Sequence, residues 1–83
     1  MKKYLVNVYL PSLNQHYDVF LPTGKKIDEA IWLLVRIFEA LSGGTFMGTA
    51  ETLLLNADNG EPFEQNMTVY DAGIRNASKL ILI

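Results

Sequence analysis

The stretch from Met67 to Ile83, "MTVYDAGIRNASKLILI", joins a compact turn to a strand. Its middle, residues 71–78, holds the small and polar residues that are typical of turns. Its end, "KLILI" at 79–83, is four-fifths aliphatic, and no polar residue follows it in the sequence. Because frayed chain ends are usually polar, we expect this last strand to be held inside a sheet.

The segments before this ending predict a hairpin and one long helix. Residues 3–10 and 16–22 alternate between apolar and polar side chains, and a short loop joins them, which indicates two antiparallel strands. In residues 25–41 the apolar side chains instead recur every three or four positions, as on one face of a helix. Gly43 and Gly44 end that helix, and Thr23 or Gly24 is expected to cap its start.

The remaining segments complete a sheet. A third strand is expected at 51–57, and "DNG" at 58–60 is a tight-turn signal. A very short fourth strand near Phe63 and a single helical turn at 68–71 precede the last strand. The predicted order is β-β-α-β-β-β, so the fold class is α+β, a mixed sheet packed on one long helix. We expect residues 1–83 to form a single domain.

Composition excludes several functional classes. The chain has seven basic and nine acidic residues, a net charge of -2, no cysteine and one histidine. No basic patch for nucleic acid is expected, and neither a thiol nucleophile nor a cysteine-bound zinc site. His16 lacks a nucleophile to activate, so we expect no enzyme activity, no cofactor and no metal. The apolar runs are too short to cross a membrane and the start is unlike a signal peptide, which predicts a soluble, cytoplasmic protein.

The order of elements, together with the ending "TVYDAGI…LILI", resembles ubiquitin and the β-grasp fold. Within that group the chain is similar to the bacterial YukD-like proteins encoded with type VII (ESX-like) secretion machinery. The similarity rests on the helix start "KKIDEAIW" at 25–32 and the turn "GIRN" at 73–76. It implies a non-enzymatic ubiquitin-like interaction module, a cytoplasmic accessory whose partner is a component of the secretion machinery. It also implies that Asp71 hydrogen-bonds to the backbone of its own turn.

The resemblance to ubiquitin has one departure. Conjugation and sulfur-carrier activity need a flexible tail ending in Gly-Gly, whereas the sequence stops at Ile83, where ubiquitin still has strand. We therefore expect a protein that is not conjugated. Two alternatives stay open: a modifier or sulfur carrier with a truncated tail, and a soluble ubiquitin-like domain of a larger membrane secretion component.

The sheet face away from the helix is the expected binding surface. If Leu80 and Leu82 pack inward together with Leu53 and Leu55, period two sends outward the residues between and after them, which are Leu54, Ile81 and Ile83. Two of these, Leu54 and Ile83, match apolar positions of ubiquitin's recognition patch, and the third such position is expected in the first hairpin. Either a protein partner or self-association would cover such a face. The predicted partner-binding residues are Leu5, Leu13, Leu54, Ile81, Ile83 and Trp32.

Trp32 belongs to a different surface. At about 100° per residue it falls on the polar side of the helix, among charged residues such as Asp28 and Arg36. One interpretation makes it an anchor for a partner, since tryptophan is common at interfaces. The other, which we favour, places it under the long loop that carries Phe46 and Met47.

Overall fold

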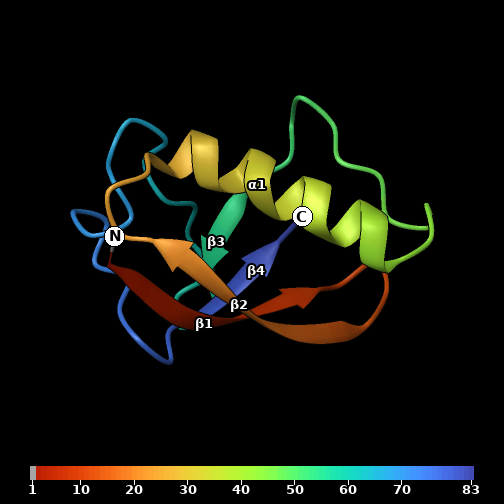
Figure 1. Cartoon of the computed structure of the whole chain (residues 1–83), viewed down its shortest axis with the longest axis horizontal. Helices are drawn as coiled ribbons and strands as arrows, with labels where there is room; N and C mark the ends of the chain where they lie inside the picture. The colour runs from red at the N-terminus through yellow and green to blue at the C-terminus, as the bar shows by residue number, and fades with distance from the viewer. Residues whose placement is uncertain (1) are drawn as a thin grey trace.

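The computed structural model describes residues 2–83 and shows one helix lying across one face of a four-stranded sheet (Figure 1). The sheet order is β2-β1-β4-β3, with β1 and β4 parallel and the two outer pairs antiparallel. The predicted α+β class with a mixed sheet is confirmed. The elements are β1 (Lys3–Leu10), β2 (Gln15–Pro22), α1 (Ile27–Leu41), β3 (Leu54–Asn56) and β4 (Lys79–Leu82).

The segment after β3 differs from its prediction. Among the described residues no strand forms near Phe63, and the sheet contains four strands instead of five. The segment makes a single bridge, between Leu55 and Pro62, and the Phe63 amide donates to the Leu54 carbonyl at 3.0 Å. Because proline has no N–H group, Pro62 cannot extend a ladder of hydrogen bonds. The segment therefore borders β3 without becoming a strand.

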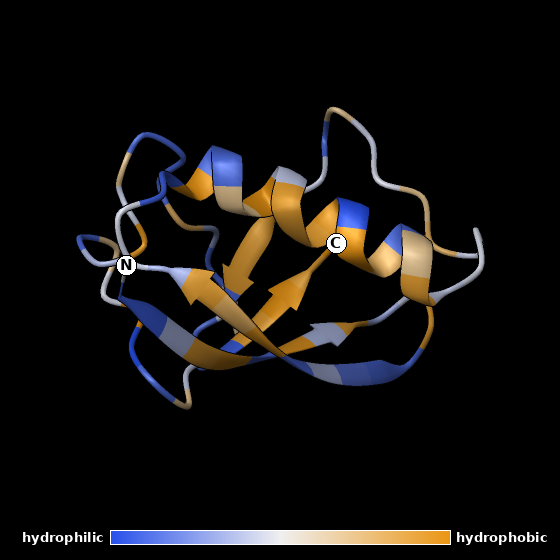
Figure 2. Cartoon of the chain, in the orientation of Figure 1, coloured by the Kyte–Doolittle hydropathy of each residue, from blue (hydrophilic) through white to orange (hydrophobic). Residues whose placement is uncertain are grey.

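The core lies between α1 and the inner face of the sheet. Phe38 is its largest fully buried side chain, and its ring lies 5.1 Å from that of Tyr17 and 6.3 Å from that of Phe46. Figure 2 shows hydrophobic residues along β3 and β4 beneath the helix. Burying one such aliphatic or aromatic side chain contributes about 1.5–3 kcal/mol. The buried strand residues are Val6, Val8, Leu10, Leu21, Leu54, Leu80 and Leu82, and those of α1 are Ile27, Ala30, Ile31, Leu34, Val35 and Phe38.

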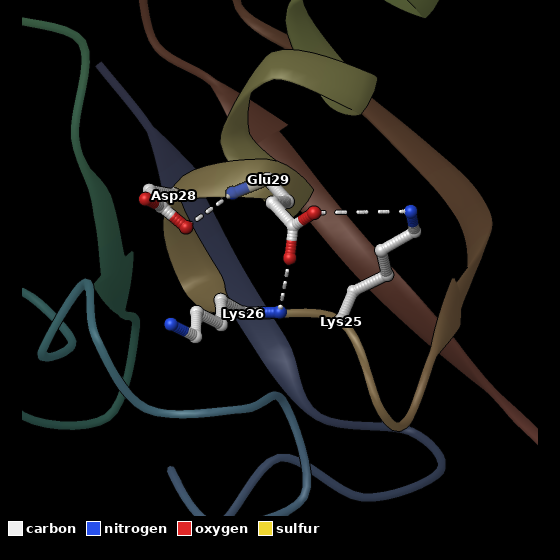
Figure 3. A network of polar contacts seen from close by, with 4 residues as sticks. All are labelled: Lys25, Lys26, Asp28 and Glu29. Carbon is white, nitrogen blue, oxygen red and sulfur yellow. Dashed lines mark hydrogen bonds and ion pairs between the residues drawn. The ribbon is translucent and has the colours of Figure 1, made fainter.

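The helix begins later than Thr23 or Gly24 would allow, so the predicted cap is wrong. The N-cap residue is Lys26. A carboxylate oxygen of Glu29 accepts a hydrogen bond of 3.2 Å from the Lys26 amide (Figure 3). The other carboxylate oxygen of Glu29 lies 4.0 Å from the ammonium of Lys25. A carboxylate in the first turn satisfies a free N–H group and also interacts favourably with the helix dipole.

The first turn of α1 is tied to the turn that precedes β4. The Ile27 amide donates to the Met67 carbonyl at 2.8 Å, and the Val69 amide donates to the Lys25 carbonyl at 2.8 Å. Within this turn the Asp71 amide donates to the Thr68 hydroxyl oxygen at 3.0 Å. The hydrogen bond to the turn backbone that was expected of the Asp71 side chain is therefore made by the Thr68 side chain. Two segments distant in sequence thus form hydrogen bonds between backbone groups that would otherwise lack partners.

The other end of α1 stops as predicted, at two glycines with positive φ, Gly43 at 63° and Gly44 at 90°. The loop that follows crosses back over the helix. The Gly48 amide donates to the Glu39 carboxylate at 3.1 Å, and the Gly48 backbone lies against the side chain of Val35. The loop therefore closes the helix side of the core.

Candidate interaction surface

The sheet face opposite α1 is left uncovered by the described residues. Register places alternate residues of neighbouring strands on the same face, so the outward positions follow from the pairing. From edge to edge they are His16, Asp18, Phe20 and Pro22 of β2, Lys3, Leu5, Asn7 and Tyr9 of β1, Lys79, Ile81 and the adjoining Ile83 of β4, and Leu55 of β3 with the preceding Leu53. The face has an apolar end, a polar middle and a second apolar end.

The first apolar end is formed by Leu53, Leu55, Ile81 and Ile83, here called the aliphatic patch. Leu55 lies opposite Ile81 in the β3–β4 ladder. Leu53 and Ile83 exchange two backbone hydrogen bonds of 2.7 and 3.0 Å. Ile83 is 52% exposed, whereas the other three side chains are half-buried. These cross-strand pairs make one continuous apolar strip.

Leu54 is not part of this strip, and its predicted outward orientation is wrong. Its side chain is 1% exposed and lies in the core. Leu54 pairs with Leu82, and directly opposite residues point to the same face of a sheet. Since Leu82 faces the helix, Leu54 does too, and Leu53 and Leu55 take the outward positions. Three consecutive leucines carry no alternation, so this run alone could not reveal the orientation.

An aromatic pair adjoins the aliphatic patch. Tyr9 lies beside Ile81 in the parallel β1–β4 pair, and the His16 ring stacks on the Tyr9 ring with 4.5 Å between centroids. The Tyr9 hydroxyl donates to the Asn14 side-chain oxygen at 2.9 Å. These contacts hold the tyrosine ring in place as an extension of the apolar strip.

The polar middle, here called the polar belt, consists of Asn7, Asp18 and Lys79. The Asn7 amide group donates to the Asp18 carboxylate at 3.1 Å, and its carbonyl oxygen lies 3.0 Å from Nδ1 of His16. With that oxygen as acceptor, His16 Nδ1 carries the proton. Lys79, in contrast, forms no ion pair with any residue in 2–83. The belt therefore holds one engaged carboxylate and one available ammonium group.

The second apolar end contains an open groove of about 630 Å³. Leu5 forms its apolar wall and is 42% exposed, and Phe20, its cross-strand partner, is 59% exposed. The groove is closed at one side by the turn before β4, where the Leu5 amide donates to the Asn76 side chain at 2.9 Å. Its lining residues are Leu5, Val6, Asn7, Asp18, Asn76, Ala77 and Lys79. Leu5 is thus separated from Ile81 and Ile83 by the polar belt.

Leu13 and Trp32 do not join this face. Leu13 is half-buried and packs against the core. Trp32 is 56% exposed on α1, and the expectation that Phe46 and Met47 cover it is wrong. Phe46 is inserted into the core, whereas Met47 is 68% exposed. Sequence reasoning also missed Leu53 and Leu55 as outward residues, and the pairing of β3 with β4 is the signal that reveals them.

Two searches of the described residues were negative. Residues 2–83 contain no group of three or more histidine, aspartate or glutamate side chains arranged to hold a metal ion. Among the same residues no helix combines the length and the apolar character needed to cross a bilayer.

Sequence comparison gives no relatives, because no family model and no curated protein matches the chain. Solved structures give clear likenesses. The ubiquitin-like domain of EccD5 from Mycobacterium xenopi has a TM-score of 0.82 at 17% identity, covering 100% of this chain and 94% of that one. The ubiquitin-like domain of the Mycobacterium tuberculosis type VII secretion protein ECCD1 has a TM-score of 0.78 at 18% identity, covering 100% and 99%.

A third likeness lies inside a larger assembly. A chain of an ESX-5 inner membrane complex has a TM-score of 0.82 at 13% identity, and the match covers 100% of this chain and 21% of that one. At such identities the likenesses establish the fold. The chain has the ubiquitin-like β-grasp fold, as its sequence predicted, while its assignment to the YukD-like proteins stays a prediction.

Proposed function

We propose that this protein is a non-enzymatic ubiquitin-like interaction module of bacterial type VII secretion, and that it docks a component of the secretion machinery through the aliphatic patch. The observation that carries the proposal is the apolar strip formed by the aliphatic patch and Tyr9 on an uncovered sheet face. Contiguous exposed apolar surface commonly marks an interaction site. Likeness to EccD ubiquitin-like domains supports the choice of system.

The test compares two aspartate variants. Leu55→Asp combined with Ile81→Asp places two charges within the aliphatic patch, and both positions are half-buried on the outer face. Leu41→Asp is the matched control, since Leu41 is 59% exposed at the end of α1 on the other side of the molecule. Circular dichroism confirms that each variant is folded before binding is measured.

Each tagged variant is used for crosslinked pulldown from the native membranes, with the captured proteins identified by mass spectrometry. We expect wild type and Leu41→Asp to capture a secretion component encoded beside this gene, and the double variant to lose it. Equal capture by all three contradicts docking through the aliphatic patch. A dimer in sedimentation analysis that the double variant abolishes would favour self-association instead.

One observation favours a second arrangement, in which this fold is a domain of a larger membrane secretion component. In the ESX-5 complex the matching fold makes up 21% of a longer chain. Reading the coding sequence beyond Ile83 distinguishes this arrangement from a free module, because membrane-spanning segments would follow. A Gly-Gly ending at that place would instead support the modifier or sulfur-carrier alternative.

A further inference from the structure

We propose that the groove beside Leu5 is a second anchor for the same partner, and that Lys79 between the two anchors binds an acidic side chain of that partner. The proposal rests on the proposed function and adds the chemistry of the partner segment. It predicts an extended segment with an apolar, an acidic and an apolar residue in alternate positions. Three observations carry it.

The first observation is the shape of the groove. It is large enough for an aromatic or a branched side chain, and its lining includes Leu5 and Ala77. Phe20 stands beside Leu5 and is more than half exposed. Pockets that take a single apolar anchor are common where interface energy is concentrated.

The second observation is the charge of the sheet. The described strands carry two lysines, Lys3 and Lys79, and one acidic residue, Asp18. The other eight of the nine acidic residues lie outside the strands. Asp18 accepts a hydrogen bond from the Asn7 amide, whereas the ammonium of Lys79 forms no ion pair within residues 2–83. An acidic residue of the partner would complement it.

The third observation is the spacing. Leu5, Asn7 and Tyr9 are alternate residues of β1, and alternate residues of a strand are about 6.6 Å apart. Lys79 pairs with Asn7 and Ile81 pairs with Tyr9. The groove and the aliphatic patch are therefore about 13 Å apart, with Lys79 halfway between them. A partner strand that packs face to face along β4 presents its own alternate residues at the same steps.

These observations also argue against a second copy of this chain as the occupant. A second copy would present its own Lys79 and Lys3 and, on its strands, the single carboxylate of Asp18. Two copies would therefore bring together four lysines and two carboxylates on their strands. This excess of lysines costs free energy, whereas a different partner can supply a free acid.

The test uses two head-to-tail cyclic β-hairpin peptides as probes. The first presents Phe, Glu and Leu at alternate positions along one face, and the second carries Lys in place of Glu. Cyclisation fixes the extended conformation and lowers the entropy lost on binding. Binding is followed by two-dimensional NMR of the labelled protein, in which the amide signals of Ala77, Lys79 and Ile81 report the groove, the polar belt and the aliphatic patch.

We expect the Glu peptide to shift all three signals and to bind about tenfold more tightly than the Lys peptide, as for one charge-assisted contact. Lys79→Glu should reverse this preference, and Phe20→Ser should weaken binding of both peptides. Lys25→Glu, a charge reversal at the start of the helix, should leave the preference unchanged.

Three results of the peptide experiment overturn the inference: equal affinity of the two peptides, shifts confined to Ile81, or no binding of either. Shifts confined to Ile81 would leave the proposed docking through the aliphatic patch intact. Loss of that docking is measured separately, by the pulldown with Leu55→Asp and Ile81→Asp. A dimer that forms without peptide and is abolished by Lys79→Glu would identify a second copy as the occupant and would also overturn the inference.

Discussion

The two faces of the sheet are built from the same strands but have different surroundings. On the inner face Leu54, Leu80 and Leu82 are each 1% exposed beneath the helix. On the outer face their sequence neighbours Leu55, Ile81 and Ile83 are equally apolar, yet they are only half-buried or exposed and lie outside the core. Alternation should give such neighbours polar side chains if the outer face only met water. The difference therefore separates apolar side chains that stabilise the fold from those that remain available to a partner.

The sharpest test of this comparison uses the two adjacent leucines of β3. Leu54→Ala should lower the free energy of unfolding by about 2–5 kcal/mol, because it leaves a cavity in the core. Leu55→Ala should lower it by about 1 kcal/mol or less, because that side chain lies half-buried on the outer face. Urea denaturation measures both. A larger loss for Leu55→Ala would mean that the register of β3 is shifted by one residue.

The contact between α1 and the loop that follows it can be tested at Gly48. A methyl group at this position would overlap the side chain of Val35, so Gly48→Ala should cost about 1–3 kcal/mol. The double variant Gly48→Ala with Val35→Ala should be less destabilised than the sum of the single variants, since the smaller residue makes room. Thermal denaturation of the four proteins gives this coupling. Strict additivity would contradict the close approach of the loop to the helix.

The smallest expected effects concern two cations close together in sequence, Arg75 in the turn before β4 and Lys79 at the start of β4. The Arg75 guanidinium lies 4.1 Å from the centre of the Tyr70 ring and donates to the Tyr70 carbonyl at 2.9 Å. Arg75→Met should therefore cost about 1 kcal/mol. Lys79→Met should change stability by about 0.5 kcal/mol or less, because Lys79 forms no ion pair within residues 2–83. Equal losses would show that Lys79 has a structural role, which would weaken its assignment to a partner.

Local pattern was sufficient for most of the elements. The alternation in residues 3–10 predicted β1 with its observed bounds, and the three- to four-residue spacing predicted α1 to within two residues of its start. Gly43 and Gly44 ended the helix as expected, because both adopt a positive φ that other residues avoid. These features depend on residues that are close to one another in the sequence, so local pattern is enough to predict them.

The predictions that were wrong concern features that depend on contacts between segments distant in the sequence. The start of α1 was misplaced because the Met67 and Gln65 carbonyls accept hydrogen bonds from the Ile27 and Asp28 amides, so a cap at Thr23 or Gly24 was not needed. Trp32 was expected under the loop, but the loop instead inserts Phe46 into the core and passes over Val35. Packing between segments far apart in sequence decided both, and local propensity carries no record of it.

The same division applies to the candidate site. Period two by itself determined that Leu80 and Leu82 share one face of the last strand and that Ile81 and Ile83 share the other. It could not determine which leucine of 53–55 joins them, since that depends on the register with β4. Only the tertiary structure brought Leu5 of β1 onto the same sheet face as Lys79 and Ile81 of β4. Hydrogen bonding between strands sets that arrangement, and it joins residues that no local pattern connects.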